Sequence, residues 1–436
     1  MFNPKIFSNK VSFFTLIIFA VASCQAYATA QYQLNTAIGY GELNPQSIYL
    51  NDVNTQNNTY DSQRELSTQI VGFELKYRKS RDFTFYTDSY VINEKVFKFN
   101  DTQFNSEHES NFKVNELYAS YRFNNQTKLT VGRKRFLWGH GFSYIPSDFV
   151  NPPLDPTSLD LTNNKGVDSI SADYFSGNSA YSFMLNLDDA TENGGFGLKY
   201  TNSDISDVDW NLIYYYSDET EHALGFSFSS FPLSWMGLEN KSLTLMANLA
   251  YKGASQYRVL TRETFSQTGD NFAGIYGVKG EGAYQNQLVS LSYDLSDYRM
   301  IIRAEYYKID EAYRENELQY IYSSLESPTS LPYLLSAEWL SHLSYGRNQR
   351  YYSALSISQD TLFEASGNRF LDTFSYSFDI LRGKDKSTMY NLRLTSLYFN
   401  TTNIGVNILV PKGDANTEFG SMPYKWNLDL VVAYNF

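Results

Sequence analysis

The segment from Gly132 to Gly166 holds most of the side chains that could do chemistry in this chain. A basic triplet, Arg133-Lys134-Arg135, is followed by His140 and Ser143. A hydrolytic site needs a nucleophile, a base within hydrogen-bond reach and a third group that orients the base. Outer-membrane phospholipases carry a compact His-x-Ser-Asn motif, and the pair His140/Ser143 departs from it in spacing and lacks the asparagine. We therefore predict that His140 is a structural loop residue and that the chain is not an enzyme.

Metal, thiol and nucleic-acid chemistry are also disfavoured. The four histidines are scattered and give no metal-ligand spacing, so we expect no metal and no cofactor. Cys24 is the only cysteine, which excludes a disulfide framework. The formal net charge is −12, and this sign argues against a nucleic-acid partner.

The elements around the segment alternate apolar and polar residues with a period of two. Val71, Phe73 and Leu75 alternate with Gly72, Glu74 and Lys76, and similar runs recur to the end of the chain. The last strand, 426–436, has the same pattern and stops on Phe436. Such alternation predicts strands with one apolar and one wet face. A closing strand with a terminal aromatic is typical of an outer-membrane barrel, and Phe436 resembles the signal read by the barrel-insertion machinery.

Residues 1–30 have the layout of a secretory signal peptide. Lys5 and Lys10 precede an apolar run at 11–22, and Ala28-Thr29-Ala30 offers a cleavage site. An alternative is the lipobox-like Val21-Ala22-Ser23-Cys24, which would make Cys24 a lipidated N-terminus. We expect an exported chain in which residues 31–436 form one domain.

Composition points to a transmembrane barrel in the bacterial outer membrane. The chain has 37 Tyr and 31 Phe, yet its mean hydropathy is −0.40. Strands that meet lipid with every second residue explain both facts, because aromatics gather at the two interfaces. We predict an all-β fold, a single antiparallel barrel of about 18 strands with 16 as the fallback, since closure favours an even number. The segment 334–343 is ambiguous between strand and helix.

The basic triplet lies at a point where simple alternation fails. If Leu129 and Val131 face lipid, strict parity sends Arg133 and Arg135 into lipid at about 2–4 kcal/mol each at the midplane. Either the strand ends here or Gly132 marks a bulge that turns the cations inward. Both readings predict a basic cluster near the lumen wall. Pro146, Pro152, Pro153 and Pro156 then exclude helix and central strand, which predicts a long loop folded into the lumen.

The run from Gly132 to Asp155 resembles a "GR…WG…NP.D" pattern of porin-like outer-membrane proteins. It is carried by Gly132-Arg133, Trp138-Gly139, Asn151-Pro152 and Asp155. The resemblance implies that a loop folded into the barrel, here 137–165, selects what passes. The pore-lining or constriction candidates are Arg133, Lys134, Arg135, Trp138, His140, Asp148, Asn151, Asp155 and Lys165 in the loop region, with Glu74, Lys76, Arg303 and Glu305 on the wall.

Two interpretations of the wall charges stay open. Facing rows of opposite charge would set a transverse field that favours small polar or zwitterionic solutes. The same side chains could instead pair across the lumen and stiffen the wall. Exposed aromatics among Phe136, Trp138, Phe142 and Tyr144 could also guide a saccharide.

The leading functional hypothesis is a channel for diffusion or selective transport of small polar solutes. The alternative is a plugged surface barrel that binds or organises exported polysaccharide, and a barrel hydrolase is the least favoured. Expected partners are outer-membrane lipid and lipopolysaccharide, the insertion machinery and a small polar solute or saccharide. A homo-oligomer stays open, because periodicity cannot locate a flat apolar contact face.

Overall fold

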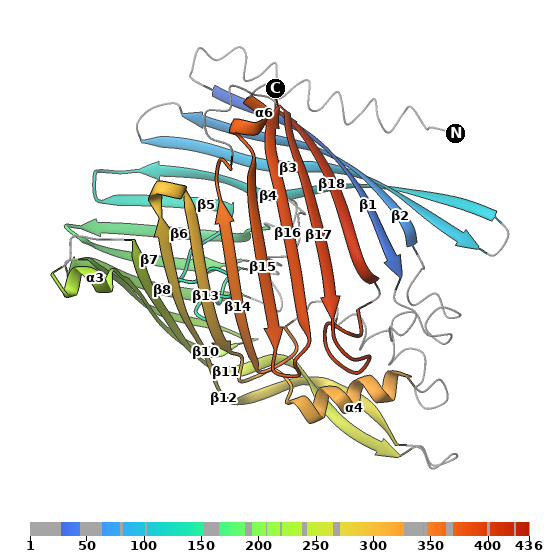
Figure 1. The fold of residues 1–436 in the computed structure, drawn as a ribbon. Coiled ribbons are helices and arrows are strands. Elements are labelled where there is room, and N and C mark those ends of the chain that lie inside the picture. The colour runs from blue at the N-terminus through green and yellow to red at the C-terminus, as the bar shows by residue number, and fades with distance from the viewer. Residues whose placement is uncertain are drawn as a thin grey trace.

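The fold is a single antiparallel sheet that closes on itself. The computed structural model describes residues 28–43, 63–78, 82–100, 103–151, 165–187, 194–205, 207–218, 220–237, 242–264, 271–326, 343, 347–362, 369–398, 402–422 and 424–435. Eighteen strands lie in these ranges, and each pairs with its neighbours in the sequence. The last strand, β18, pairs with β1 from Gln33↔Asn435 to Leu43↔Tyr424. The sheet is therefore a closed barrel (Figure 1).

The strands run in chain order around the ring. They are β1 Ala28–Leu43, β2 Gln63–Arg78, β3 Phe83–Asn100, β4 Gln103–Arg122, β5 Thr127–Lys134, β6 Val167–Ser176, β7 Ser179–Asn186, β8 Gly195–Ile205, β9 Val208–Ser217, β10 Glu221–Ser230, β11 Leu243–Thr264, β12 Asn271–Leu295, β13 Met300–Lys308, β14 Tyr351–Gln359, β15 Ser375–Gly383, β16 Thr388–Tyr398, β17 Thr402–Lys412 and β18 Tyr424–Asn435.

Short helices lie only in the connections of the described chain. The helix α4, Glu315–Glu326, belongs to the connection 309–350, and α3 (Pro232–Trp235), η3 (Ser296–Tyr298) and α6 (Arg369–Asp372) lie at the opposite barrel end. Among the residues that the structure describes, no helix is long and apolar enough to cross a membrane. We call the barrel end that carries α4 the loop end and the other the turn end (Figure 1).

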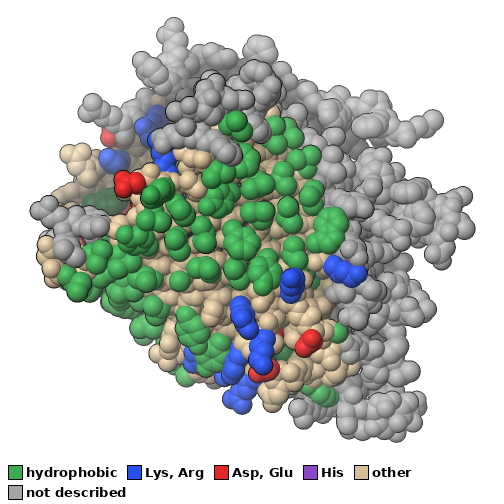
Figure 2. Space-filling model, viewed as in Figure 1, with side chains coloured by type: hydrophobic (Ala, Val, Ile, Leu, Met, Phe, Trp, Pro, Cys, Tyr) green, Lys and Arg blue, Asp and Glu red, His purple; other side chains and the backbone are tan. Residues whose placement is uncertain are grey.

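Alternation along each strand separates an apolar outer face from a polar inner face. On the outer face, register places Ile302, Ile357, Phe378, Leu392 and Ile408 in one row across five strands. On the inner face, the row one residue along β13 contains Arg303, Ser356 and Asp379. Figure 2 shows the hydrophobic side chains as a broad band on the outer wall. The expected barrel of eighteen strands is confirmed.

Some sequence expectations concern residues outside the described ranges. Residues 1–27, with Cys24, lie outside them, and so do Phe436 and most of 334–343. The strand β1 starts at Ala28, so the expected cleavage after Ala30 would remove its first residues, and the signal peptide stays a prediction. The ambiguous segment is not needed to close the ring, because the described strands already do so. Its last residue, Leu343, is buried.

Candidate functional site

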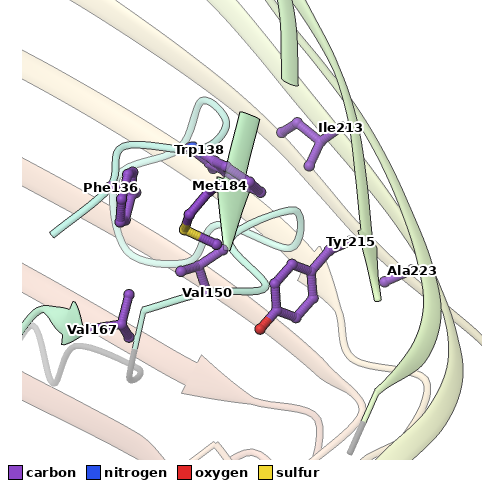
Figure 3. Packing of buried hydrophobic residues seen from close by; sticks show 8 residues of the cluster. All are labelled: Phe136, Trp138, Val150, Val167, Met184, Ile213, Tyr215 and Ala223. Atoms are coloured by element: carbon purple, nitrogen blue, oxygen red, sulfur yellow. The ribbon is translucent and has the colours of Figure 1, made fainter. Parts of the chain in front are cut away.

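The described part of the connection between β5 and β6, residues 135–151 and 165–166, lies inside the barrel and packs against its inner wall. We call it the inward loop. Its Phe136, Trp138 and Val150 form an apolar cluster with wall residues of β6, β7, β9 and β10, namely Val167, Met184, Ile213, Tyr215 and Ala223 (Figure 3). The Trp138 ring lies edge-on to Tyr215, with ring centroids 6.5 Å apart. Burial of these side chains fixes the loop to one side of the lumen.

Glycines on the wall make room for the loop. A Cβ on Gly197 of β8 would lie 2.2 Å from the Trp138 ring, and one on Gly225 of β10 would lie 2.6 Å from Ser147. Neither position can take a larger side chain unless the loop moves. Gly139 in the loop has φ of +111°, a conformation that side-chain-bearing residues rarely adopt.

The base of the inward loop is held to β4. The Arg135 backbone N–H donates to Glu116 Oε1 at 2.8 Å, and the Gly166 N–H donates to the Asn115 carbonyl at 2.8 Å. Inside the loop, the Phe136 N–H donates to Asn151 Oδ1 at 2.9 Å. Asn151 is therefore a buried structural link between the two arms of the loop.

The tip of the inward loop is held to β13 by a carboxylate. Glu305 is 5% exposed and accepts from the backbone N–H groups of Phe142 at 3.1 Å and Ser143 at 2.9 Å. The Ser143 hydroxyl donates to the same carboxylate, and the Arg347 guanidinium donates to the Ser143 carbonyl. Hydrogen bonds to a charged acceptor are the stronger kind. The tip is thus fixed by several charge-assisted bonds.

These two anchors lie on opposite walls. The strands β4 and β13 are nine places apart in a ring of eighteen. Between these anchors the described part of the loop follows the inner wall past β6, β7, β9, β10 and β11, and it narrows the lumen from that side. The expectation of a loop folded into the lumen agrees with this geometry.

His140 and Ser143 do not form a nucleophile–base pair in the structure. His140 Nδ1 lies 3.1 Å from Ser227 Oγ and 3.2 Å from Asn211 Nδ2, whereas the Ser143 hydroxyl is engaged by Glu305. Ser227 is fully buried, so it cannot meet a substrate. Burial, with the nearby positive charge of Lys199, lowers the pKa of His140. The histidine ties the loop to the wall.

The placement of Arg133 corrects a sequence expectation. Register through β5 is unbroken, with Leu117↔Arg133 on one side and Arg133↔Asp168 on the other. Gly132 has φ of +122° but inserts no extra residue into the strand. Arg133 therefore lies on the outer face of the sheet, as Val131 does, and does not join the lumen wall. A bidentate pair with Asp168, at 3.0 and 2.6 Å, compensates its charge. The basic triplet is split between the two faces.

Of the remaining predicted pore-lining residues, some pack against the wall or the inward loop and others are exposed. Lys134 has inward parity, and its Nζ lies 5.3 Å from the centre of the Phe136 ring. Trp138 is only 3% exposed, so it faces the wall and, contrary to expectation, does not line the pore. Burial raises the pKa of Asp148 to about 6, although Asn151 and Arg135 act against this shift. Lys165 is exposed, Arg135 is half-buried, and Asp155 lies outside the described residues.

The lumen retains a charged wall on each side. Arg303 of β13 lies with its guanidinium carbon 4.4 Å from the centre of the Phe142 ring, and Phe142 is 51% exposed. Glu74 and Lys76 of β2 share the inner face, and register puts Glu74 opposite Asp88, which is in turn opposite Glu116. Acidic groups therefore gather on β2–β4, across the ring from Arg303.

Two further connections enter the same region from the loop end. Glu311, in the connection 309–350, is buried and pairs with Lys252 at 2.8 Å. Burial alone would raise the pKa of Glu311, but the charge of Lys252 and the hydrogen bonds that Glu311 accepts lower this pKa overall. In the connection 413–423, buried Glu418 accepts from the Asn348 backbone N–H at 2.9 Å and from the Tyr352 hydroxyl. Arg347, next to Asn348, reaches the inward loop. The three connections thus form one network.

Sequence reasoning missed the anchors Glu116, Arg347 and Glu418. Nothing around Glu116 in the sequence shows that its carboxylate accepts from a backbone N–H nineteen residues away. Arg347 and Glu418 lie in connections without periodicity. Their partners are 204 and 66 to 70 residues distant, and no local pattern reveals such contacts.

Comparison of the chain with protein-family models and with curated proteins gives no match. Solved structures with a similar fold include Acinetobacter baumannii OccAB3, with a TM-score of 0.52 and 11% identity over 94% of this chain and 99% of that one. Pseudomonas aeruginosa OpdQ has a TM-score of 0.52 and 9% identity, covering 94% and 98%. Pseudomonas aeruginosa OccK3 (OpdO) has a TM-score of 0.52 and 12% identity, covering 94% and 95%. At these identities the likeness concerns the fold alone.

Proposed function

We propose that the chain is a bacterial outer-membrane channel through which small polar solutes pass, and that the inward loop is its constriction. The single observation that carries this proposal is the loop itself, anchored to Glu116 on β4 and to Glu305 on the facing β13. Such a loop narrows a barrel this wide but need not fill it. The likeness in fold to OccAB3 and OpdQ supports the same proposal.

The outer membrane is the environment that suits both faces of the wall. Leu198, Leu212, Leu224 and Val289 are 48–52% exposed on the outer face, which an aqueous medium would penalise. The inner face is lined by serine, asparagine and charged residues. We assign the loop end to the exterior and the turn end to the periplasm, because barrels of this class carry their longer connections outside. Export by a signal peptide and insertion through Phe436 belong to the same proposal.

The charges that face the lumen favour polar or zwitterionic solutes. Arg303 has no ion pair among the described residues and lies against exposed Phe142. On the far wall, Glu74, Asp88 and Glu116 supply negative charge. Opposite charges on facing walls set a transverse field that orients a dipolar solute. Arg303 and Phe142 are the groups that we expect a carboxylate-bearing or aromatic part of the solute to touch.

Single-channel recording in planar bilayers tests the proposal. Discrete conductance steps are expected, with larger steps after deletion of residues 140–150. A silent protein would contradict the channel. An unchanged step size after the deletion would contradict the constriction, provided that the deleted chain still forms a heat-stable barrel in detergent.

A plugged surface barrel is the second candidate, favoured by one observation. Three connections meet inside the loop end through Glu305, Arg347 and Glu418, and this network occupies part of the lumen. Such a barrel would be silent in bilayers and would retain exported polysaccharide. We do not expect enzymatic activity, because the two candidate catalytic side chains, His140 and Ser143, have separate partners.

A further inference from the structure

A row of directly opposed residues crosses the outer face of five strands near the loop end. Register links Tyr306 to Ser353, Ser353 to Arg382, Arg382 to Thr388 and Thr388 to Lys412. The Lys384 backbone N–H donates to the Tyr351 carbonyl, so Lys384 lies one step closer to the loop end. Adjacent strands are about 4.8 Å apart, which places Arg382 and Lys412 within about 10 Å of each other.

Aromatic rings shape the surface around these cations. The rings of Tyr306 and Tyr351 stack with centroids 6.3 Å apart, and Lys384 Nζ lies 5.2 Å from the centre of the Tyr351 ring. Lys412 Nζ lies 5.6 Å from the Tyr390 ring in the same manner. A shallow groove of about 480 Å³ is lined by Tyr306, Tyr351, Tyr352, Ser353, Arg382, Gly383 and Lys384.

The positive charge of this surface is not neutralised by the protein. Arg382, Lys384 and Lys412 are exposed, and none of them has an ion pair among the described residues. Two acids near these cations have other partners: Asp310, just after β13, pairs with Lys308 at 3.0 Å and Arg350 at 3.6 Å, and the Asp385 carboxylate accepts from the backbone N–H groups of Ser387 and Glu418. A chain with a net charge of −12 thus presents a local cationic patch.

The patch borders the apolar band. The next row toward the turn end is Ala304, Leu355, Ile380, Tyr390 and Val410, and the row after it contains Ile302, Ile357, Phe378, Leu392 and Ile408. Figure 2 shows Lys and Arg side chains gathered below the hydrophobic band on this wall. The cations therefore lie where acyl chains end and headgroups begin.

We propose that Arg382, Lys384 and Lys412 bind the phosphate groups of a phosphorylated glycolipid of the outer leaflet, such as the lipid portion of lipopolysaccharide. This rests on the proposed placement of the barrel in the outer membrane. A guanidinium holds phosphate with two parallel hydrogen bonds, and ammonium groups add point charges. Tyr306 and Tyr351 present amphipathic rings at the interface, beside the sugar. The acyl chains lie along the apolar rows.

The test measures retention of diphosphorylated lipid A by the full chain in detergent, using native mass spectrometry. The triple variant Arg382→Gln, Lys384→Gln, Lys412→Gln is expected to retain it at least tenfold more weakly than the unaltered chain. The matched control replaces three exposed cations elsewhere, Lys113, Arg122 and Arg314, by Gln and is expected to retain it fully. The unaltered chain should also hold dephosphorylated lipid A at least tenfold more weakly.

Three results would overturn the proposal: undiminished retention by the triple variant, equal loss in the control variant, or equal affinity of the unaltered chain for the dephosphorylated lipid. The last comparison needs no variant, so it stands even if the triple variant fails to fold. Conductance recorded on the same samples separates the two proposals. A chain that conducts but does not discriminate lipid phosphates refutes only this inference, and a silent chain that does discriminate refutes only the channel.

Discussion

Replacement of Glu305 by Ala should free the tip of the inward loop. The carboxylate accepts the backbone N–H groups of Phe142 and Ser143 and the Ser143 hydroxyl. In Glu305→Ala these donors lose their acceptor, whereas the Arg347 bond to the Ser143 carbonyl stays. We expect the tip to leave β13 far more often while the rest of the loop keeps its place through the apolar cluster around Trp138.

The size of the effect follows from the number and kind of the bonds. A hydrogen bond to a charged group contributes about 1.5–3 kcal/mol when it is buried. Lumen water can reach the freed groups, so we take a total of about 3 kcal/mol for the three bonds rather than the upper limit. At about 1.4 kcal/mol per factor of ten, the population with a detached tip rises roughly 100-fold. Glu305→Gln keeps one good acceptor oxygen and should produce a smaller rise, about tenfold.

Amide hydrogen exchange measures this directly, because Phe142 and Ser143 carry the two backbone donors. Their protection should fall roughly 100-fold in Glu305→Ala, and single-channel steps should become larger or noisier. Asp173→Ala is the matched control, since this inner-face carboxylate bonds to Ser182 and not to the inward loop. Equal exchange rates at both amides in Glu305→Ala and the unaltered chain would refute the anchoring role.

Three further outcomes are expected. Burial raises the pKa of Glu418 to about 7 from 4.5. The attached connection 413–423 therefore binds one more proton than the detached one between pH 4.5 and about pH 7. Its attachment is strongest below this pH range and weakens by up to about 3 kcal/mol as the pH rises through it. Amide exchange rates of this connection that are equal at about pH 5 and pH 8, after correction for intrinsic rates, would contradict this. Gly197→Ala should cost about 1–3 kcal/mol because its Cβ meets Trp138, whereas Gly405→Ala, whose nearest contact would be 3.7 Å away, should leave the thermal unfolding midpoint unchanged. Arg303→Gln should shift ion selectivity toward cations and raise the blocking concentration of a carboxylate solute about tenfold, and an unaltered reversal potential in a salt gradient would count against its contact with the permeating solute.

The barrel could be predicted from the sequence because its signal is local and repeated. Alternation in segments such as 71–77 and 426–436 fixes which side chains face outward, and neighbours in sequence are neighbours in the sheet. The requirement of closure then selects an even number of strands. The inward loop was also predictable, because prolines and a basic triplet interrupt the alternation at one place.

The detailed chemistry of the loop was not predictable, because each contact joins residues that are far apart in the chain. Arg133 was expected to avoid lipid by turning inward, but Asp168 on the next strand neutralises it in place. Trp138 was expected to face the solute, but the absence of a side chain at Gly197 lets it dock into the wall. Composition indicates that such groups exist, and only the closed sheet decides which of them meet.

The anchoring of the inward loop has a consequence for the order in which the molecule is assembled. The loop emerges between β5 and β6, yet its tip is bonded to Glu305, 162 and 163 residues farther along the chain. Contacts of such sequence separation form late, because the intervening chain must first be ordered. The wall has to be complete from β5 through β13 before the tip finds its acceptor. We therefore expect the passage to be wider before β13 is in place than after the tip of the loop has bonded to it.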